Sequence, residues 1–496
     1  MDDLKGRSVR GIAVTLGAQA LKFLIGLGAT MILARLLSPK DYGMLAMVGS
    51  ITGFVAVLRD GGLSIATIQR AEINDAQIST LFWINSTLGL ALAVIVAAIS
   101  PAVAWFYGDP SLLLVTLAMA IPFMLGGVTV QHQALLARQM RFKVMAAIEI
   151  ASLFLSAVAG IVAAAVGWRY WALVVVAIAF SLANATLVFF FCRWKPGRPI
   201  RGSGVRSMLK FGGALTLNNL FDSLGSSSDK IFLGKFFAAD VVGLYTRAQT
   251  LMLQPLTQLA PVIRNVVLPA MSRLAEKPQR FKKVLLDLMQ VTAFVCSFLT
   301  VFLVVNADWL VSVFLGPRWV GTSDILRLLA GPAVVIPLNT LCVISITAQS
   351  KGAALMRWGL LSNLINVLAI LAGLPWGAKG VAAGLSITSV CLLMPILNYM
   401  TARAGPASLK EVWSAIGPGI CSCISGCGVL YWVRYGFGLQ APLPGLLVLF
   451  LVNCLFHALI MGILPSGRRA FARVIDTASS FRKARHGTLE PRMASK

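Results

Sequence analysis

The sequence contains little charge for its length. Only 12% of its 496 residues are Asp, Glu, Lys or Arg, whereas about 25% is typical of a soluble domain. Apolar runs of membrane-spanning length recur along the whole chain. Because hydrocarbon offers the backbone no hydrogen-bond partners, each run is expected to form a helix. The composition excludes a large soluble domain and predicts an all-α polytopic membrane protein.

Chemical groups that enzymes and ATP-driven pumps need are also scarce. The chain has three histidines, and no acidic residue neighbours His132 or His457 in the sequence. It contains no G-x-x-x-x-G-K-[ST] phosphate loop. Its eight cysteines lie almost entirely in apolar runs, which favours core packing over metal ligation or disulfides. We therefore expect no catalytic residue, no metal site and no cofactor.

The charge that is present is strongly basic and unevenly placed. Lys and Arg number 43 against 18 Asp and Glu, for a formal net charge of +25. The excess lies in short loops and in the C-terminal tail, which follows the positive-inside rule and argues against a nucleic-acid surface. Placing the N-terminus in the cytoplasm puts most of these residues on the cytoplasmic side. We expect an even number of spans in a bacterial inner membrane, with both termini cytoplasmic.

About fourteen transmembrane helices with short connections are expected. The expected spans are 12–37, 42–58, 78–102, 112–136, 145–166, 171–191, 209–237, 241–262, 284–305, 325–346, 358–375, 380–399, 412–433 and 443–464. Each loop on the far side of the membrane is too short to fold alone as a catalytic domain.

The two halves of the chain show weak internal similarity. The aligned pairs include Leu33 with Leu233, Arg35 with Lys235 and Gly43 with Gly243 at an offset of 200, and Gly167 with Gly377 at an offset of 210. Both halves start on the same side of the membrane, so this is a parallel repeat, as in transporters with a central site. It predicts a six-helix lobe at 1–200, a second at 201–405, two additional helices at 406–464 and a basic cytoplasmic tail at 465–496.

Charged side chains inside the spans concentrate in the first, seventh and eighth. A charge at the bilayer centre costs about 2.5–3.5 kcal/mol on insertion scales, so such residues usually face a wet cavity or a partner. Helical spacing aligns polar side chains on one face of each span. The candidate cavity residues are Gln19, Lys22, Asn219, Asp222, Asp229, Lys230, Arg247 and Gln254. A cavity with this basic lining would suit a phosphate. The alternative to a cavity role for Lys22 is a static ion pair with Asp222 or Asp229.

Oxygen-bearing side chains recur in the eleventh and twelfth expected spans. They are Asn363, Asn366 and Thr388. Together with Asp222 and Asp229 they are candidates for ion coupling. Hydrogen bonding between helices is the alternative interpretation.

Three stretches of the sequence resemble a known family. They are SDKIFLGK at 228–235 with GLYTRA at 243–248 and Pro255, ILARLLSPKDYG at 32–43, and VVLPAMSR at 266–273. These stretches resemble bacterial polysaccharide repeat-unit flippases of the Wzx type. That family belongs to the polysaccharide transporters of the MATE-like MOP superfamily and serves lipopolysaccharide or exopolysaccharide biosynthesis.

The resemblance implies a two-lobed transporter that works by alternating access. It would flip a polyprenyl-pyrophosphate-linked oligosaccharide to the periplasmic leaflet for exopolysaccharide, capsule or O-antigen synthesis. The motif carries Asp229, Tyr245 and Arg247 to this chain as cavity residues. Expected partners are membrane lipids, the lipid-linked oligosaccharide, a polysaccharide polymerase and a chain-length regulator, but no nucleic acid. A MATE-like exporter of small molecules and a membrane polysaccharide polymerase or ligase stay open as alternatives.

Overall fold

The fold is entirely helical in the part of the chain that the structure, a computed structural model, describes. The described residues are 2–59, 67–68, 73–200, 225, 227–257 and 259–463, with backbone only for 2–16, 259–263 and 265–266. The all-α class expected from the composition is therefore confirmed.

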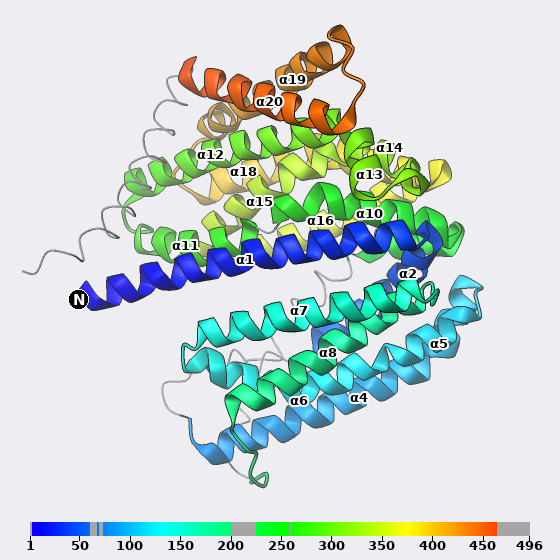
Figure 1. Ribbon diagram of the computed structural model, residues 1–496. Coiled ribbons are helices and arrows are strands. Elements are labelled where there is room, and N and C mark those ends of the chain that lie inside the picture. The colour runs from blue at the N-terminus through cyan, green and yellow to red at the C-terminus, as the bar shows by residue number, and fades with distance from the viewer. Residues whose placement is uncertain are drawn as a thin grey trace, which may run out of the picture.

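The helices form two groups (Figure 1). The first half contains α1 (Asp2–Leu36), α2 (Pro39–Leu58), α4 (Asp75–Tyr107), α5 (Ser111–Ala118), α6 (Ala120–Arg138), α7 (Phe142–Ala165) and α8 (Trp171–Cys192). After the helical residues 227–236, the second half contains α10 (Ala239–Thr257), α11 (Leu259–Arg273), α12 (Pro278–Val305), α13 (Ala307–Phe314), η1 (Pro317–Trp319), α14 (Gly321–Leu328), α15 (Ala330–Ala348), α16 (Gly352–Gly373), η2 (Leu374–Trp376), α17 (Gly377–Thr388), η3 (Ser389–Leu393) and α18 (Met394–Ala404). The last two helices are α19 (Leu409–Gly436) and α20 (Pro442–Ile463). α1 packs on α7, α2 packs on α10, and α19 packs along α12.

Eleven helical stretches among the described residues are long and apolar enough to cross a membrane. One of them, Gly352–Ala404, contains two expected spans, in α16 and in the run from α17 to α18. The expected span 241–262 falls on α10 and α11, which are not among the eleven. The span 209–237 falls largely outside the described residues, as does the tail at 465–496. The number fourteen and the bounds of the four predicted segments therefore stay predictions.

The fourth and tenth expected spans are each broken in two, into α5 with α6 and into α14 with α15. A proline lacks an N–H, and its ring collides with the carbonyl four residues earlier. α5 ends at Ala118, four residues before Pro122, and α14 ends at Leu328, four residues before Pro332. The two breaks lie 210 residues apart, which is the second offset of the internal repeat.

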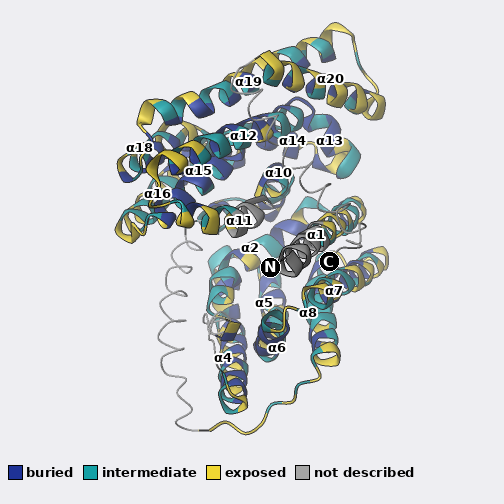
Figure 2. Ribbon diagram, turned by 90° about the vertical axis from the view of Figure 1, so that its left-hand side faces the viewer, coloured by how far each residue is buried: buried dark blue, intermediate teal, exposed yellow. Residues whose placement is uncertain are grey.

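The outward faces of the helices are apolar. Along α20 a stripe of leucines recurs every four residues, and each is more than 60% exposed: Leu443, Leu447, Leu451, Leu455 and Leu459. Figure 2 shows exposed residues along the outer sides of α16, α19 and α20. In water such a stripe would promote aggregation, whereas in a bilayer it faces acyl chains.

The two halves meet most closely where α2 and α10 begin. A Cβ on Gly43 would fall on the backbone carbonyl of Ala239, and a Cβ on Gly243 would fall on that of Pro39. Gly243 follows Gly43 by 200 residues and Ala239 follows Pro39 by 200, so the two contacts are reciprocal. Only glycine permits this backbone contact between helices. The exchange of partners is what a pseudo-two-fold axis between the halves requires.

Two side chains at equivalent positions of the repeat add further contacts at this end. Arg35 Nη2 donates to the Val313 carbonyl at 2.8 Å. Lys235, the counterpart of Arg35, donates through Nζ to the Phe106 carbonyl at 2.6 Å. We call this region, residues 34–43, 235–243 and 313–319, the junction. It closes the end of the protein at which α1 finishes.

An ion-pair network fastens α19 to the second half. Arg434 of α19 forms a bidentate pair with Asp308 of α13, with N–O distances of 2.9 and 2.5 Å. Its guanidinium also lies over the Trp309 ring, with Cζ 3.9 Å from the centroid. Arg327 of α14 bonds the same carboxylate at 3.0 Å. The bidentate geometry gives the docking of α19 a fixed orientation.

Replacing Asp308 by Asn should destabilise the protein in a pH-dependent way. Burial works to raise the pKa of Asp308, but the hydrogen bonds and charge of Arg434, with the charge of Arg327, outweigh it and lower the pKa. A carboxylate of this kind contributes stability above its unfolded-state pKa, about 3.9, and loses it as the pH falls through the folded-state value. The carboxylate is 40% exposed, so solvent screens part of the pair and we expect a loss of about 1–3 kcal/mol at pH 7.

Thermal unfolding in detergent, at pH 7 and at pH 3, measures this effect. The difference in melting temperature between Asp308→Asn and the parent protein should shrink at the lower pH. An equal difference at both pH values would contradict the assigned role of the Asp308 charge.

Candidate functional site

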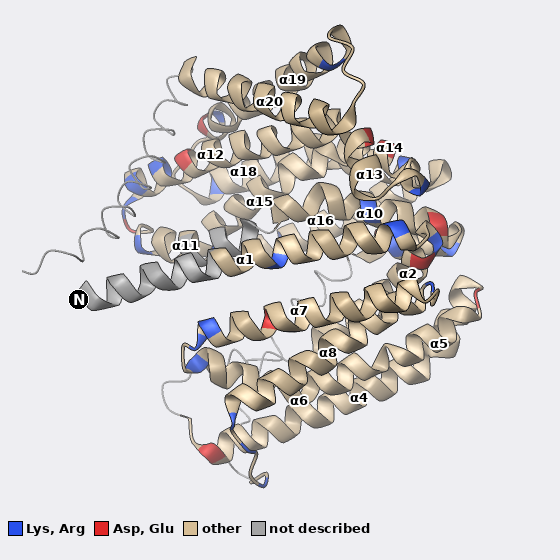
Figure 3. Ribbon diagram, in the orientation of Figure 1, with Lys and Arg blue, Asp and Glu red and all other residues tan. Residues whose placement is uncertain are grey.

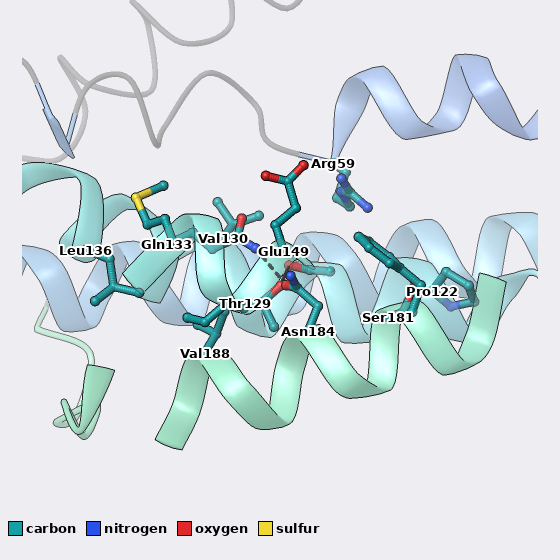
Figure 4. A pocket seen from close by; sticks show the side chains of 14 residues that line it. Arg59, Pro122, Thr129, Val130, Gln133, Leu136, Glu149, Ser181, Asn184 and Val188 are labelled. Atoms are coloured by element: carbon teal, nitrogen blue, oxygen red, sulfur yellow. Dashed lines mark hydrogen bonds between the residues drawn. The ribbon is translucent and has the colours of Figure 1, made fainter. Parts of the chain in front are cut away.

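A cavity of about 300 Å³ lies inside the first half, between α6, α7 and α8 and beside the end of α2. Its polar lining consists of Arg59, Thr129, Gln133, Glu149, Ser181 and Asn184. Thr129 and Gln133 are four residues apart on α6, and Ser181 and Asn184 are three apart on α8, so each pair shares a helix face. Gln133 Nε2 donates to Asn184 Oδ1 at 2.8 Å (Figure 4). The cavity thus presents amide, hydroxyl and charged groups inside an apolar bundle.

Arg59 reaches this cavity across a glycine. It follows the last residue of α2, and a Cβ on Gly126 of α6 would lie 2.6 Å from Arg59 Cδ. The missing side chain of Gly126 therefore leaves room for the arginine. Within the described part of the chain Arg59 forms no ion pair. It adds a positive charge to the lining.

An ion pair between α1 and α7 borders the same cavity. Lys22 Nζ lies 2.8 Å from Glu149 Oε2, and the two side chains are 19% and 49% exposed. Figure 3 shows Lys, Arg, Asp and Glu gathered at the two ends of the helices, with few along their middles. Arg59, Lys22 and Glu149 together carry a net positive charge. This cluster is the site that best fits the predicted basic cavity.

Glu149 is not among the candidate residues predicted from the sequence. Asp222 or Asp229 was the predicted alternative partner of Lys22, whereas the structure pairs Lys22 with Glu149. A usable signal was present, because Glu149 is the only charged residue in the expected span 145–166 and an acid inside a span marks a functional candidate.

Not every predicted residue of the first and seventh spans has a described position. Gln19 is partly buried on α1, three residues before Lys22. Asn219 and Asp222 lie outside the described residues. Their assignment to the cavity stays a prediction.

The structure brings Asp229 and Tyr245 together. The Asp229 carboxylate is 4% exposed and accepts hydrogen bonds from the Tyr245 hydroxyl at 2.9 Å and from Gln249 Nε2 at 3.0 Å. The backbone N–H of Lys230 donates to the other carboxylate oxygen at 2.8 Å. Both side-chain donors come from α10, so the cluster fixes α10 to the helix of residues 227–236. Lys230 itself is partly exposed.

Arg247 lies at the junction. Its guanidinium carbon is 4.2 Å from the centre of the Tyr42 ring on α2, and its Nε has no hydrogen-bond partner among the described residues. The charge is thus stabilised by the face of an aromatic ring rather than by an acid. Gln254, two turns further along α10, is exposed. Lys22 and Arg247 therefore contact different elements, α7 and α2.

Besides Asp229 and the undescribed Asp222, the residues proposed for ion coupling lie on two helices of the second half, α16 and α17. Asn363 of α16 lies against Gly225, one turn before Asp229, and Asn366 is one turn further along α16. Thr388 donates to the Gly384 carbonyl of its own helix at 2.8 Å. No group of three His, Cys, Asp or Glu residues suited to a metal ion occurs among the described residues. The proposed cation site stays a prediction.

Two solved structures define the class of fold. The lipid II flippase MurJ in an inward closed conformation matches with a TM-score of 0.72 at 15% identity, over 92% of this chain and 98% of that one. An inward-facing multidrug resistance MATE family transporter of the MOP superfamily matches with a TM-score of 0.61 at 14% identity, over 80% and 99%. The protein is thus a polytopic membrane protein with the MOP-superfamily transporter fold.

Sequence comparison gives the family. Residues 32–324 match the model of a family described as polysaccharide biosynthesis protein, and the chain belongs to this family. TuaB, a teichuronic acid biosynthesis protein of Bacillus subtilis (strain 168), is 25% identical over 71% of this chain and 72% of its own. WzxC, a lipopolysaccharide biosynthesis protein of Escherichia coli (strain K12), is 25% identical over 77% and 78%. ExoT, a succinoglycan biosynthesis transport protein of Rhizobium meliloti (strain 1021), is 22% identical over 86% and 85%. The resemblance read from the sequence is confirmed.

Proposed function

We propose that this protein flips a polyprenyl-pyrophosphate-linked oligosaccharide from the cytoplasmic to the outer leaflet of the bacterial inner membrane. The observation that carries the proposal is a polar cavity of net positive charge inside the apolar bundle of a polysaccharide biosynthesis protein. A relative named as a succinoglycan biosynthesis transport protein and a fold shared with a lipid II flippase support the same conclusion.

The physical need for such a cavity follows from the substrate. A hydroxyl that leaves water for hydrocarbon without a new hydrogen bond loses about 4–8 kcal/mol, and an oligosaccharide carries many hydroxyls. The amides of Gln133 and Asn184 and the hydroxyls of Thr129 and Ser181 replace water as hydrogen-bond partners. The lipid tail stays among the acyl chains outside the bundle.

The cations suit the pyrophosphate. Lys22 and Arg59 both attract it, and an arginine fork matches phosphate oxygens. A cavity of about 300 Å³ lies at the lower end of the range for small-molecule sites. It therefore takes the pyrophosphate and the adjoining sugar, and the remaining sugars extend between the two halves.

Transport then requires the junction to open. Parting α2 from α10 frees Arg247 from the Tyr42 ring, so that its charge becomes available to the pyrophosphate on the way out. The membrane potential assists, because two negative charges leaving a cytoplasm-negative cell across 100 mV gain about 4.6 kcal/mol.

The proposal includes an orientation and partners. Both termini face the cytoplasm, which places the junction on the outer side of the membrane. The protein performs no chemical step itself. A polysaccharide polymerase and a chain-length regulator take over the flipped repeat unit on the outer side.

Deletion of the gene tests the proposal. We expect lipid-linked repeat units to accumulate in the cytoplasmic leaflet, where an enzyme or lectin added outside spheroplasts cannot reach them. Expression of the parent chain should again let the enzyme or lectin reach the repeat units. Repeat units that are fully accessible in the deletion strain would overturn the proposal.

A matched assay separates flipping from export of small molecules, the alternative on the same fold. The deletion strain and the complemented strain are compared for efflux of soluble amphipathic dyes. The proposal predicts equal efflux, whereas an exporter would show a difference there and normal labelling of repeat units.

A further inference from the structure

A second cavity of about 300 Å³ lies at the junction, apart from the site in the first half. Ala34 and Arg35 of α1 form one wall. The other wall consists of Ser312, Gly316, Pro317 and Arg318, from the end of α13 to η1. The hollow therefore straddles the two halves of the protein.

The segment that carries Arg318 is held rigidly. The next residue, Trp319, is fully buried, and its Nε1 donates to the Ala34 carbonyl at 2.8 Å. Its ring meets the Tyr42 ring edge-on at 5.3 Å. Gly316 has a φ of +97°, which favours glycine, and Pro317 fixes its own φ. Arg318 is thus presented on a preorganised turn.

The cavity is cationic. Arg35 and Arg318 are both exposed, and within the described residues neither takes part in an ion pair. The Arg35 guanidinium uses Nη2 for the Val313 carbonyl and keeps its other donors free. The carboxylates of the same segment, Asp308 and Asp324, are engaged by other cations. Two arginine forks therefore face one hollow without a counter-charge.

We propose that this cavity binds the phosphate-bearing headgroup of a lipid in the outer leaflet. Arginine forks bind phosphate oxygens bidentately, and a volume of about 300 Å³ admits a phosphate or diphosphate headgroup. The cavity lies where α1 ends, at the level of lipid headgroups on the outer side. This inference rests on the orientation and function proposed above.

Binding at this place also regulates transport. Arg35 belongs to the first half and Arg318 to the second, so the site is complete only while the junction is closed. A ligand that binds one of two states stabilises that state. A diphosphate lipid that has accumulated in the outer leaflet therefore holds the protein closed on the outer side and slows further flipping.

The test uses the full chain, purified in the phosphate-free detergent dodecyl maltoside and titrated with geranyl diphosphate. Hydrogen–deuterium exchange at residues 312–320 is the readout, so no transport is needed. We expect slower exchange with ligand and an apparent Kd at least tenfold higher for Arg318→Gln. Arg318 donates no hydrogen bond to the described protein, so this variant keeps the fold. Arg169→Gln, another exposed arginine at the same end, should bind as the parent chain does.

Nanodiscs that contain phosphatidylglycerol distinguish the two sources of phosphate. If they protect residues 312–320 fully and geranyl diphosphate adds nothing, the site takes phospholipid headgroups. If only the diphosphate protects, the site takes the diphosphate lipid. Unchanged exchange with both ligands, or an Arg318→Gln variant that responds like the parent chain, would overturn the proposal. The deletion assay tests the proposed function, whereas hydrogen exchange tests this binding, so the two proposals can fail separately.

Discussion

A Gly43→Ala variant should lose most of its flipping activity while still inserting into the membrane. The added methyl would fall on the Ala239 carbonyl, a backbone atom that cannot rotate away. Overpacking of this kind costs about 1–3 kcal/mol, and each 1.4 kcal/mol is a factor of ten in an equilibrium. The closed junction should therefore become about 10–100-fold less populated, and a transporter that cannot close on the outer side cannot reload from the cytoplasm.

A matched control is available on the same helix. A Cβ on Gly49 of α2 meets nothing within 4 Å, so Gly49→Ala removes a glycine without touching the junction. Hydrogen exchange of residues 36–43 and 237–243 should rise in Gly43→Ala and stay at the parent level in Gly49→Ala. Because the contacts are reciprocal, Gly243→Ala should behave like Gly43→Ala. Normal flipping by both junction variants would show that the close approach is not needed.

Replacing Lys22 by Gln should reduce flipping by about 10–100-fold. One charged hydrogen bond to the pyrophosphate contributes about 1.5–3 kcal/mol, and Glu149 would be left in the cavity as an uncompensated negative charge. Glu149→Gln should cost less, because it leaves Lys22 free for the substrate. The rate at which repeat units become accessible on the outer side measures both effects.

A charge swap separates substrate binding from a purely structural pair. The double variant Lys22→Glu, Glu149→Lys keeps the ion pair but moves the cation from α1 to α7. We expect it to flip poorly, because the cation leaves the position on α1 from which it attracts the pyrophosphate and a carboxylate takes its place, although position 149 also lines the cavity. Restored activity in the swap would assign the pair a structural role only. Lys143→Gln, which removes an exposed charge at the beginning of α7, controls for net charge.

Much of the fold could be predicted because hydropathy and repeat offsets can be read directly from the sequence. The offset of 200 relates Gly43 to Gly243, and the structure shows both glycines in equivalent contacts between the halves. The breaks at Pro122 and Pro332 were missed, although proline chemistry predicts both. The helix count stays a prediction, because the expected span 209–237 falls largely outside the described residues and the expected span 241–262 falls on α10 and α11, which are not among the eleven membrane-spanning candidates.

The site was less predictable, because partners come from distant parts of the chain. Lys22 was recognised from its place inside a span, but nothing local shows that Glu149, 127 residues later, lies opposite it. Arg247 was recognised as a cation without a neighbouring acid. Its aromatic partner Tyr42 lies 205 residues earlier, and only the packing of α2 on α10 brings the two together.

The reciprocal glycine contacts give each half a self-complementary patch. Gly43 meets Ala239, and its repeat equivalent Gly243 meets Pro39, the equivalent of Ala239. Such an exchange of equivalent contacts is the geometry of an isologous interface between identical subunits. The two halves of this single chain therefore meet as two identical subunits of a dimer would. A substitution at either glycine alters only one of the two equivalent contacts and makes the interface asymmetric. A tolerated change in one half therefore depends on the residue at the equivalent position of the other half.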